Sequence, residues 1–488
     1  MEKKAIVIGA GLGGIAVAIR LALKGYKVRV FEASDGPGGK LNSFSLGDYR
    51  FDWGPSLFTM PDHVLDLFRA AGRNPEDYFR YAQVPLACRY FFEDGTKINA
   101  YTKRVNYTAE IKQKLGVEEK VTNRYINHSI WLHKMLSPVF LEKSLHRTGS
   151  FLSWKTVRAA VFFPKMDIFT SMNEANERRL RHPKLVQMFN RMATYNGSSP
   201  YKAPGILNII SSLEHDSGVF FPEGGMYSIT KSLVKLASDL GVEFNYKERV
   251  NEILHKDKKI TGVETERGII HSDLVISNMD IIPTYKCLLP GVKSPDKTLK
   301  QKRSSSALVF YWGINREFPE LDLHNIFFSE DYRKEFEYLF EKFDITDDPT
   351  VYVNISSKQN PGDAPIGHEN WFVMINAPQY AGQDWDLITY RTREKVIAKL
   401  SRILNTDFSK LIAKEYILDP SEIELKTSSY RGSLYGTNSN SKFAAFLRHP
   451  NFTGKIKGLY FVGGSVHPGG GIPLVLQSAK ICAGIIPS

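Results

Sequence analysis

The glycine pattern near the amino terminus constrains this chain more than any other feature. Residues 5–8 form a short apolar run, and the sequence continues as Gly9-x-Gly11-x-x-Gly14 into a segment whose apolar residues repeat with helical spacing. Such a run is typical of a buried parallel strand that is followed by a tight turn and a helix. A second short apolar strand then ends at Glu32. The segment therefore predicts a β-α-β unit that binds a dinucleotide.

Each residue of this motif has its own physical task. Gly9 allows the tight turn, Gly11 lets the backbone approach a pyrophosphate, and Gly14 lets the helix pack close to the strand. The anion then lies at the helix amino terminus, where free N–H groups and the helix dipole stabilise it. The carboxylate of Glu32 accepts hydrogen bonds from ribose hydroxyls and repels a 2′-phosphate, which disfavours NADP. A glycine-rich turn that binds nothing is the alternative interpretation.

A second glycine pair follows sooner than a plain NAD domain would place its next helix. Gly39 and Lys40, preceded by another glycine, come a few residues after Glu32 and lead to the pair Gly54-Pro55. This arrangement resembles the extended FAD motif of the glutathione-reductase-like flavoproteins, in particular the branch with amine oxidases and carotenoid desaturases. The resemblance implies FAD as the cofactor, with Gly39 and Lys40 near its phosphates and ribose and Gly54 and Pro55 near the flavin. For this segment alone, a surface turn before an edge strand is the alternative.

The carboxy-terminal glycine-rich block strengthens the resemblance. Residues 458–472 are similar to the signature of bacterial-type phytoene dehydrogenases, although Val466 and Gly470 depart from its commonest residues. A glycine-rich turn at a helix amino terminus places N–H groups where they stabilise the negative charge of a reduced flavin. The resemblance implies that FAD also contacts Gly463, Gly464, Gly471, Ile472 and, beside the adenine, Val250.

The family resemblance covers most of the chain and implies a substrate class. Residues 52–61 are most similar to enzymes that desaturate the 3,4 bond of hydroxylated carotenoids. We therefore expect an FAD-dependent oxidoreductase that removes a hydride and a proton from adjacent carbons of an apolar carotenoid. Quinone or oxygen is the expected electron acceptor. The alternatives are a phytoene or lycopene desaturase, a flavin amine oxidase, and a non-catalytic prenyl-binding relative such as the Rab GDP-dissociation inhibitors.

No side chain stands out as a catalytic group. Hydride loss beside a polyene leaves a delocalised cation, so the adjacent proton becomes acidic and a weak base or water is sufficient to remove it. His467 lies in the carboxy-terminal turn and is either a base or a structural histidine that binds the backbone. The sequence contains no metal-ligand cluster, nucleophile elbow or Walker loop. We therefore assign no catalytic residue and no metal site.

The order of these segments predicts an α/β protein with a discontinuous cofactor domain. A Rossmann-like FAD-binding domain of the glutathione-reductase/amine-oxidase type is assigned to residues 1–85, 216–285 and 450–488. A substrate domain with a mixed sheet is assigned to residues 86–130 and 286–449, and a helical basic segment, with an expected membrane contact, to residues 131–215. The wider region 86–215 is expected to be rich in helices.

Positive charge is concentrated in the helical basic segment. The chain has 64 Lys and Arg against 52 Asp and Glu, a net charge of +12. Between Trp131 and Asn190 ten Lys and Arg face four acidic residues, hence half of that net charge. Phe151, Leu152, Trp154, Val157, Val161, Phe162 and Phe163 alternate there with Lys155, Arg158 and Lys165. This pattern fits an interfacial helix on anionic lipid and equally an amphipathic helix packed on a sheet. Nucleic acid is not expected as a partner, because no recognition motif accompanies the charge.

The sequence indicates a cytoplasmic protein that contacts the membrane peripherally. No run of about 18 apolar residues is present to span a bilayer. The amino terminus carries no apolar export signal. The three cysteines, Cys88, Cys287 and Cys482, lie far apart and lack C-x-x-C spacing, which fits a reducing compartment.

Overall fold

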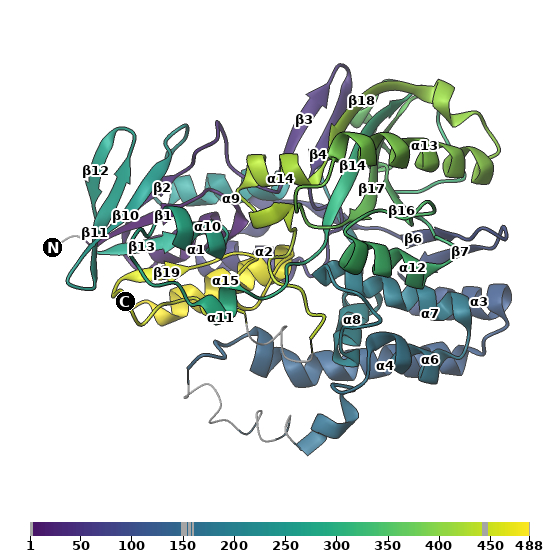
Figure 1. The fold of residues 1–488 in the computed structure, drawn as a ribbon, viewed down its shortest axis with the longest axis horizontal. Helices are drawn as coiled ribbons and strands as arrows, with labels where there is room; N and C mark the ends of the chain where they lie inside the picture. The colour runs from purple at the N-terminus through teal and green to yellow at the C-terminus, as the bar shows by residue number, and fades with distance from the viewer. Residues whose placement is uncertain (1–2, 148–153, 155–157, 159–160, 442–447, 488) are drawn as a thin grey trace.

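The computed structural model describes residues 3–147, 154, 158, 161–441 and 448–487. Two sheets lie side by side, and a group of helices lies beneath the second sheet (Figure 1). Among the described residues, no helix is both long enough and apolar enough to cross a membrane. The interfacial helix expected around residues 151–163 falls largely on residues outside this description, including Phe151, Leu152, Lys155 and Val157.

The first sheet is parallel and has five strands in the order β19-β13-β1-β2-β9. The strands are β1 (Lys4–Ile8), β2 (Lys27–Phe31), β9 (Glu243–Asn245), β13 (Leu274–Ser277) and β19 (Leu459–Phe461). They come from three parts of the chain that are far apart in sequence, as the glycine motifs predict. The exact domain boundaries remain a prediction.

Alternate residues of β1 pack against different layers, as the period of a strand requires. Ala5 and Val7 are buried against helices, whereas Ile6 and Ile8 belong to a separate core on the opposite face. The helices are α1 (Leu12–Ala22), α2 (Asp62–Ala70), α9 (Tyr227–Asp239) and α15 (Ile472–Ile485). The opposite face is covered by β10 (Val250–Lys256), β11 (Lys259–Thr265), β12 (Gly268–His271) and α10 (Ile281–Cys287). Because both faces are covered, β1 reads as a continuous apolar run.

The second sheet is mixed and has seven strands in the order β18-β14-β17-β16-β15-β6-β7. Its strands are β6 (Leu86–Phe91), β7 (Lys97–Tyr101), β14 (Ser306–Ile314), β15 (His324–Phe327), β16 (Val351–Asn354), β17 (Glu369–Ala377) and β18 (Ile412–Leu418). All neighbours are antiparallel except β15 and β6. The α/β class with a parallel sheet and a second mixed sheet is confirmed.

The two faces of the mixed sheet have different neighbours. Phe310, Trp312 and Val373 point to one face and form a core with Val396 and Leu400, both on α13 (Trp385–Ile403). Their sequence neighbours on β14 and β17 point to the other face. Helices α12 (Tyr332–Glu337) and α14 (Pro420–Thr427) also lie next to this sheet, whereas α11 (Asp296–Leu299) packs through Leu299 on a core of the parallel sheet. Strands β3 (Asn42–Leu46) and β4 (Tyr49–Trp53) form a small hairpin, and β5 (Tyr81–Gln83) pairs with β8 (Phe220–Pro222) from a distant part of the chain.

The prediction that residues 86–215 are rich in helices is wrong at their start. Residues 86–101 form the antiparallel strands β6 and β7. Asp94 and Gly95 make the turn between them, with φ of 82° at Gly95, and Asp-Gly is a strong hairpin signal. The described part of the remainder is mainly helical, with α3 (Arg104–Leu115), α4 (Glu119–Leu136), α6 (Met172–Leu180), α7 (Pro183–Asn190) and α8 (Ser211–His215).

Candidate functional site

A single cavity of about 1810 Å³ runs from the glycine turn of the parallel sheet to the mixed sheet. Its lining comes from the start of α1, the loop before β3, the inner face of the mixed sheet, the helical segment and the start of α15. Twelve of the thirteen residues that the sequence assigns to the cofactor line it, namely Gly9, Gly11, Glu32, Gly39, Lys40, Gly54, Pro55, Val250, Gly463, Gly464, Gly471 and Ile472. Gly14 does not.

The glycine turn is built so that each glycine is required. Gly9 has a φ of 94° and its N–H donates to the carbonyl of Phe31 over 2.7 Å. A Cβ on Gly11 would lie 2.8 Å from the side-chain nitrogen of Asn278. A Cβ on Gly14 would lie 2.0 Å from the carbonyl oxygen of Gly9, so Gly14 serves the contact between helix and strand rather than the cavity.

Glu32 lies next to this turn, at the end of β2. Its Oε2 accepts a hydrogen bond from the N–H of Ala10 over 2.7 Å. Its Oε1 accepts from the N–H and the hydroxyl of Ser34, at 2.9 and 2.8 Å. These bonds fix the carboxylate beside the cavity, and Oε2 has a further lone pair for a ribose hydroxyl.

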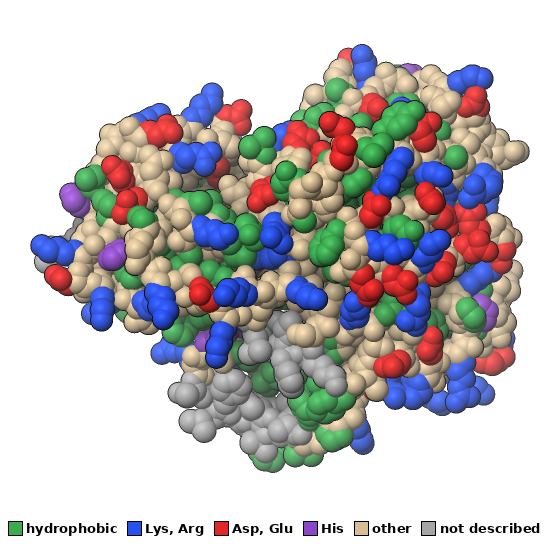
Figure 2. Space-filling model, in the orientation of Figure 1, with side chains coloured by type: hydrophobic (Ala, Val, Ile, Leu, Met, Phe, Trp, Pro, Cys, Tyr) green, Lys and Arg blue, Asp and Glu red, His purple; other side chains and the backbone are tan. Residues whose placement is uncertain are grey.

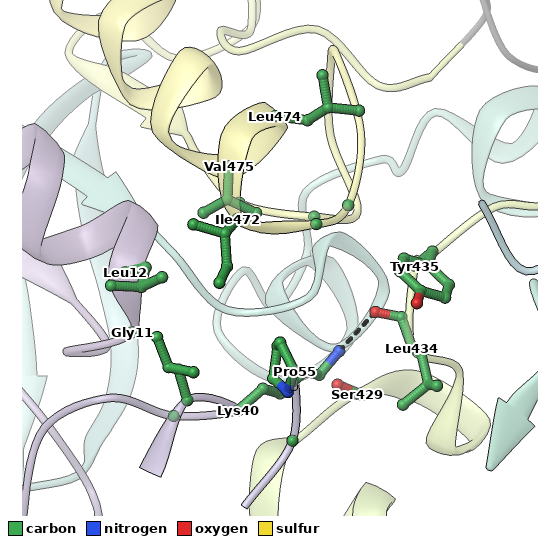
Figure 3. Close-up of a pocket in the computed structure, with 18 of the residues that line it drawn as sticks. Gly11, Leu12, Lys40, Pro55, Ser429, Leu434, Tyr435, Ile472, Leu474 and Val475 are labelled. Atoms are coloured by element: carbon green, nitrogen blue, oxygen red, sulfur yellow. Dashed lines mark hydrogen bonds between the residues drawn. The ribbon is translucent and has the colours of Figure 1, made fainter. Parts of the chain in front are cut away.

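Lys40, the residue after Gly39, also lines the cavity. Its ammonium group donates to the carbonyl of Leu434 over 3.0 Å, as Figure 3 shows. Burial lowers the pKa of Lys40 to about 8, although Asp280 nearby raises it and Arg303 lowers it further. Asp280 and Arg303 form a buried ion pair with each other. Sequence reasoning did not identify this pair as part of the site.

Gly54 and Pro55 follow β4 and face the same space. Gly54 has a φ of 110°, and a Cβ there would lie 1.8 Å from the carbonyl oxygen of Lys40. Asp52, just before them, accepts hydrogen bonds from the N–H groups of Met226 and Tyr227 at 2.8 and 3.0 Å. Asp52 therefore fixes this loop to the amino terminus of α9.

The carboxy-terminal turn closes the cavity opposite the first glycine turn. Figure 3 shows Ile472 and Val475 of α15 across from Gly11 and Leu12 of the α1 turn. Gly471, with a φ of 95°, precedes α15, and no atom lies within 4 Å of a Cβ built on it. Two helices therefore direct their amino termini at one space, which is favourable for negative charge.

His467 is a structural histidine. Its Nε2 donates to the carbonyl of Lys143 over 2.8 Å, it is not among the residues that line the cavity, and it is 1% exposed. Burial lowers the pKa of His467 to about 4. Of the two interpretations of this residue, the geometry favours the backbone-bonding one.

These features fit a dinucleotide. A Cβ on Gly11 would fill the space at the glycine turn, and two helix amino termini face this space. A fixed carboxylate, that of Glu32, lies beside it and can accept hydrogen bonds from a ribose. The sequence motifs and the geometry therefore point to the same cofactor.

Beyond this part, the cavity continues between the mixed sheet and the helical segment. Its walls there are mainly apolar and include Val309, Phe372 and Met374 of the sheet and Leu136, Ile206 and Ile210 opposite. This space accommodates a long apolar molecule. Sequence reasoning did not find these residues, because nothing local distinguishes them from ordinary core.

A buried polar cluster interrupts the apolar wall. Arg191 donates to the carboxylate of Glu214 over 3.0 Å and to the hydroxyls of Tyr195 and Tyr90, both over 2.9 Å. Burial of Glu214 is offset by the Arg191 charge, which holds the pKa of Glu214 below its usual value. Both residues come from the helical segment, where no motif signals them.

Comparison with known proteins agrees with this geometry. A family model for flavin-containing amine oxidoreductases matches residues 12–486. The 1-hydroxycarotenoid 3,4-desaturase of Flavobacterium sp. (strain P99-3) is 50% identical over 486 residues, which cover 100% of this chain and 99% of that protein. The 4,4′-diapolycopene oxygenase of Methylomonas sp is 34% identical, with 98% of this chain and 97% of that protein covered.

Solved structures show the same fold. An oxidoreductase from Methanosarcina mazei matches with a TM-score of 0.64 at 16% identity, and the match covers 98% of each chain.

Proposed function

The chain belongs to the flavin-containing amine oxidoreductases and is an FAD-dependent oxidoreductase of their carotenoid desaturase branch, and on this premise we propose that it introduces the 3,4 double bond of a 1-hydroxylated carotenoid. The similarity to a 1-hydroxycarotenoid 3,4-desaturase over the full length supports this choice. The observation that carries it is the continuous cavity, which joins the dinucleotide site to a mainly apolar space.

FAD is proposed to lie along the residues predicted for it. Its pyrophosphate would lie at Gly9, Gly11 and Gly39, its adenosine at Glu32 and Val250, and its flavin between Pro55 and the amino terminus of α15. When bound there, FAD supplies the acceptor for a hydride. Gly14 acts through packing, and Lys40 would lie near the phosphates and the ribose, where its positive charge favours them.

The residues of the chain then orient the substrate and exclude water. The apolar walls hold a rigid polyene along the cavity, so that one pair of carbons lies beside the flavin. The first N–H groups of α15 carry the partial positive charge of a helix amino terminus. They stabilise negative charge that develops at that end of the cavity. No basic side chain is required, because a polyene cation releases its proton to a weak base.

The test is the product formed when the chain is produced in cells that accumulate defined carotenoids. We expect a red-shifted product only when a 1-hydroxylated substrate is supplied. Conversion of phytoene or lycopene instead would favour the phytoene or lycopene desaturase alternative. An FAD-loaded protein that converts none of them would contradict the proposal. Assays with a quinone and with oxygen identify the acceptor, since we propose that one of the two receives the electrons.

We also propose that the helical basic segment touches an anionic membrane surface in the cytoplasm. Large apolar side chains are exposed there, with Trp154 at 78% and Val161 at 69%. Figure 2 shows hydrophobic side chains at the lower edge of the molecule, where Figure 1 places this segment. An apolar substrate that resides in membranes requires such a contact.

Vesicle binding tests this contact. The double variant Arg158→Glu, Lys165→Glu should bind phosphatidylserine vesicles at least about thirtyfold more weakly, because each basic residue near an anionic surface contributes about 1 kcal/mol. Lys410→Glu is the matched control, since Lys410 is 81% exposed outside this segment. Equal cosedimentation of both variants with wild type would leave the segment as an ordinary solvated surface.

A further inference from the structure

One arginine is buried behind the carboxy-terminal glycine turn without a carboxylate beside it. Arg448 is 2% exposed. Its Nη1 donates to the carbonyl of Tyr435 over 2.7 Å and to the carbonyl of Gly464 over 3.3 Å. Its Nη2 donates to Oδ1 of Asn196 over 2.9 Å. All three partners are neutral oxygens, so hydrogen bonds hold the guanidinium in place but leave its charge uncompensated.

The guanidinium lies next to the turn that leads into α15. A Cβ on Gly469 would lie 3.1 Å from Nε of Arg448. Gly464, whose carbonyl Arg448 binds, lines the cavity, and so does Arg448 itself. Tyr435, the other carbonyl partner, lines the part of the cavity that Figure 3 shows. Since the flavin is proposed to lie between Pro55 and the amino terminus of α15, Arg448 stands beside the turn that would hold it.

Cations outnumber carboxylates at this end of the cavity. Asp280 is paired with Arg303, and Arg448 forms no ion pair with a described residue. The residues of 148–160 and 442–447 include no Asp or Glu. Burial, and after it the charge of Arg303, lower the pKa of Arg448 to about 10, so the guanidinium is still protonated at neutral pH. Arg448 is therefore a buried positive charge without a counter-charge in the described chain.

Such a charge is costly to bury, because it loses hydration that no opposite charge replaces. The cost is offset when a ligand brings negative charge close to it. FAD can do so at its pyrophosphate or at its flavin ring, which gains negative charge on reduction. The pyrophosphate is proposed to lie at Gly9, Gly11 and Gly39, across the cavity from the turn beside Arg448. The position of Arg448 therefore favours the flavin.

We propose that the uncompensated positive charge of Arg448 raises the reduction potential of the bound flavin. The neutral oxidised ring accepts a hydride, that is two electrons and one proton, and with it gains one negative charge. A cation nearby in a low-dielectric surrounding stabilises this product more than the neutral ring. Arg448 acts across the turn through its field, without contact to FAD and without transfer of a proton. This inference goes beyond the proposed function, since it rests on the position of the flavin and not on the carotenoid.

The experiment measures the midpoint reduction potential of FAD in the purified holoprotein, near neutral pH and without a carotenoid. Arg448→Gln removes the charge and retains a hydrogen-bonding amide. We expect it to shift the two-electron equilibrium at least about tenfold toward oxidised flavin, which lowers the potential by about 30 mV. Arg448→Lys retains the charge and should lower the potential less. Arg316→Gln removes an exposed guanidinium elsewhere and is the control for charge alone.

Two variants of Asn196 separate the charge of Arg448 from its role as a structural tie. Asn196→Ala removes one hydrogen bond of the guanidinium and leaves its charge, so the potential should stay at the wild-type value. Asn196→Asp instead places a carboxylate at the same distance and compensates the charge while Arg448 remains. It should lower the potential as Arg448→Gln does, which keeps the proposal testable if Arg448→Gln does not fold.

Flavin content and melting temperature establish that each variant is folded. A wild-type potential in folded, FAD-loaded Arg448→Gln or Asn196→Asp would overturn the proposal, and so would an equal fall in Asn196→Ala. ADP carries the pyrophosphate without the flavin, so weaker ADP binding by the Arg448→Gln apoprotein at an unchanged potential would assign the charge to the pyrophosphate instead. A wild-type enzyme that converts no carotenoid would contradict the proposed function alone, because the potential is measured without substrate.

Discussion

On the side of the parallel sheet the cavity is lined at its glycine turns by backbone atoms, whereas on the side of the mixed sheet it is lined by side chains. On the parallel side, Gly11 and Gly471 leave N–H groups and open space where a larger residue would intrude. On the mixed side, Val309 and Met374 present their side chains directly. A surface made of backbone tolerates only glycine at its closest approaches, but a surface of side chains accepts many sequences of similar volume. The first kind of site is therefore visible in a sequence and the second is not.

The largest effect is expected from the backbone side. Gly11→Leu should abolish FAD retention, because its Cβ would already lie 2.8 Å from Asn278 and the rest of the side chain would fill the pyrophosphate space. Flavin absorbance of the purified protein measures this. Gly36→Ala is the control, since no atom lies within 4 Å of a Cβ at Gly36. A yellow Gly11→Leu protein would show that the cofactor lies elsewhere.

A smaller effect is expected where a side chain serves the cofactor. Glu32→Ala should weaken FAD binding about tenfold to a hundredfold, because hydrogen bonds to a charged group contribute about 1.5–3 kcal/mol. Titration of the apoprotein with FAD gives the dissociation constant. Asp35→Ala removes an exposed carboxylate from the same loop and should leave the constant unchanged. If the two variants bound FAD with equal affinity, Glu32 would not be a cofactor-binding residue.

The mixed sheet should respond differently to substitution. Met374→Trp is expected to lower kcat/KM about tenfold and to leave FAD bound, because the larger ring occupies substrate space without reaching the glycine turns. Leu387→Trp adds the same ring on α13, on the opposite face, where Leu387 is 57% exposed. If Met374→Trp lost its flavin as well, the mixed-sheet side of the cavity would contribute to FAD binding and not only to substrate binding.

The smallest effect concerns pH. It tests whether buried histidines on both sides of the cavity lower the free energy of unfolding in acid. Burial lowers the pKa of His215 and His324 on the mixed side, and of His449 and His467 near the carboxy-terminal turn, to about 4. The unfolded chain binds more protons between pH 6.5 and 4, so the free energy of unfolding falls as pH is lowered through this window.

His215→Phe should reduce that pH dependence by up to about 1.4 kcal/mol per pH unit, the contribution of one proton. The Phe ring replaces an imidazole that stacks on Tyr107 with ring centroids 4.7 Å apart. Denaturant unfolding at several pH values measures the slope, and His255→Phe, at an exposed position, is the control. A slope that remains at the wild-type value would mean that His215 binds as many protons in the folded protein as in the unfolded chain.

The sequence predicts the cofactor side because steric necessity is local. Gly14 lies close to the carbonyl oxygen of Gly9, and Gly54 lies close to the carbonyl oxygen of Lys40. Only glycine fits at these two positions, so each of them is a glycine at a fixed place in a motif. The strands β1 and β19 could be predicted for the same reason, since each is a short apolar run that leads into a glycine turn.

The substrate side depends on contacts between distant residues. Arg89 of β6 lies beside Asn325 of β15 in a parallel pair, and the sequence of neither strand predicts this pairing. Ser56 and Tyr352 form a hydrogen bond across 296 residues of sequence. Only the folded chain places His324 beside Tyr352, so this contact has no sequence signature.

Because β19 and α15 lie at the carboxy-terminal end of the chain, the parallel sheet can be completed only late in synthesis. More than four hundred residues separate β19 from β2 in the same sheet. At ribosomal rates of roughly 5–20 residues per second, the first glycine turn waits on the order of 20–90 s for the strand and helix that complete its site. For most of its translation the growing chain therefore exposes an apolar sheet that still lacks its last strand and the helix that covers it.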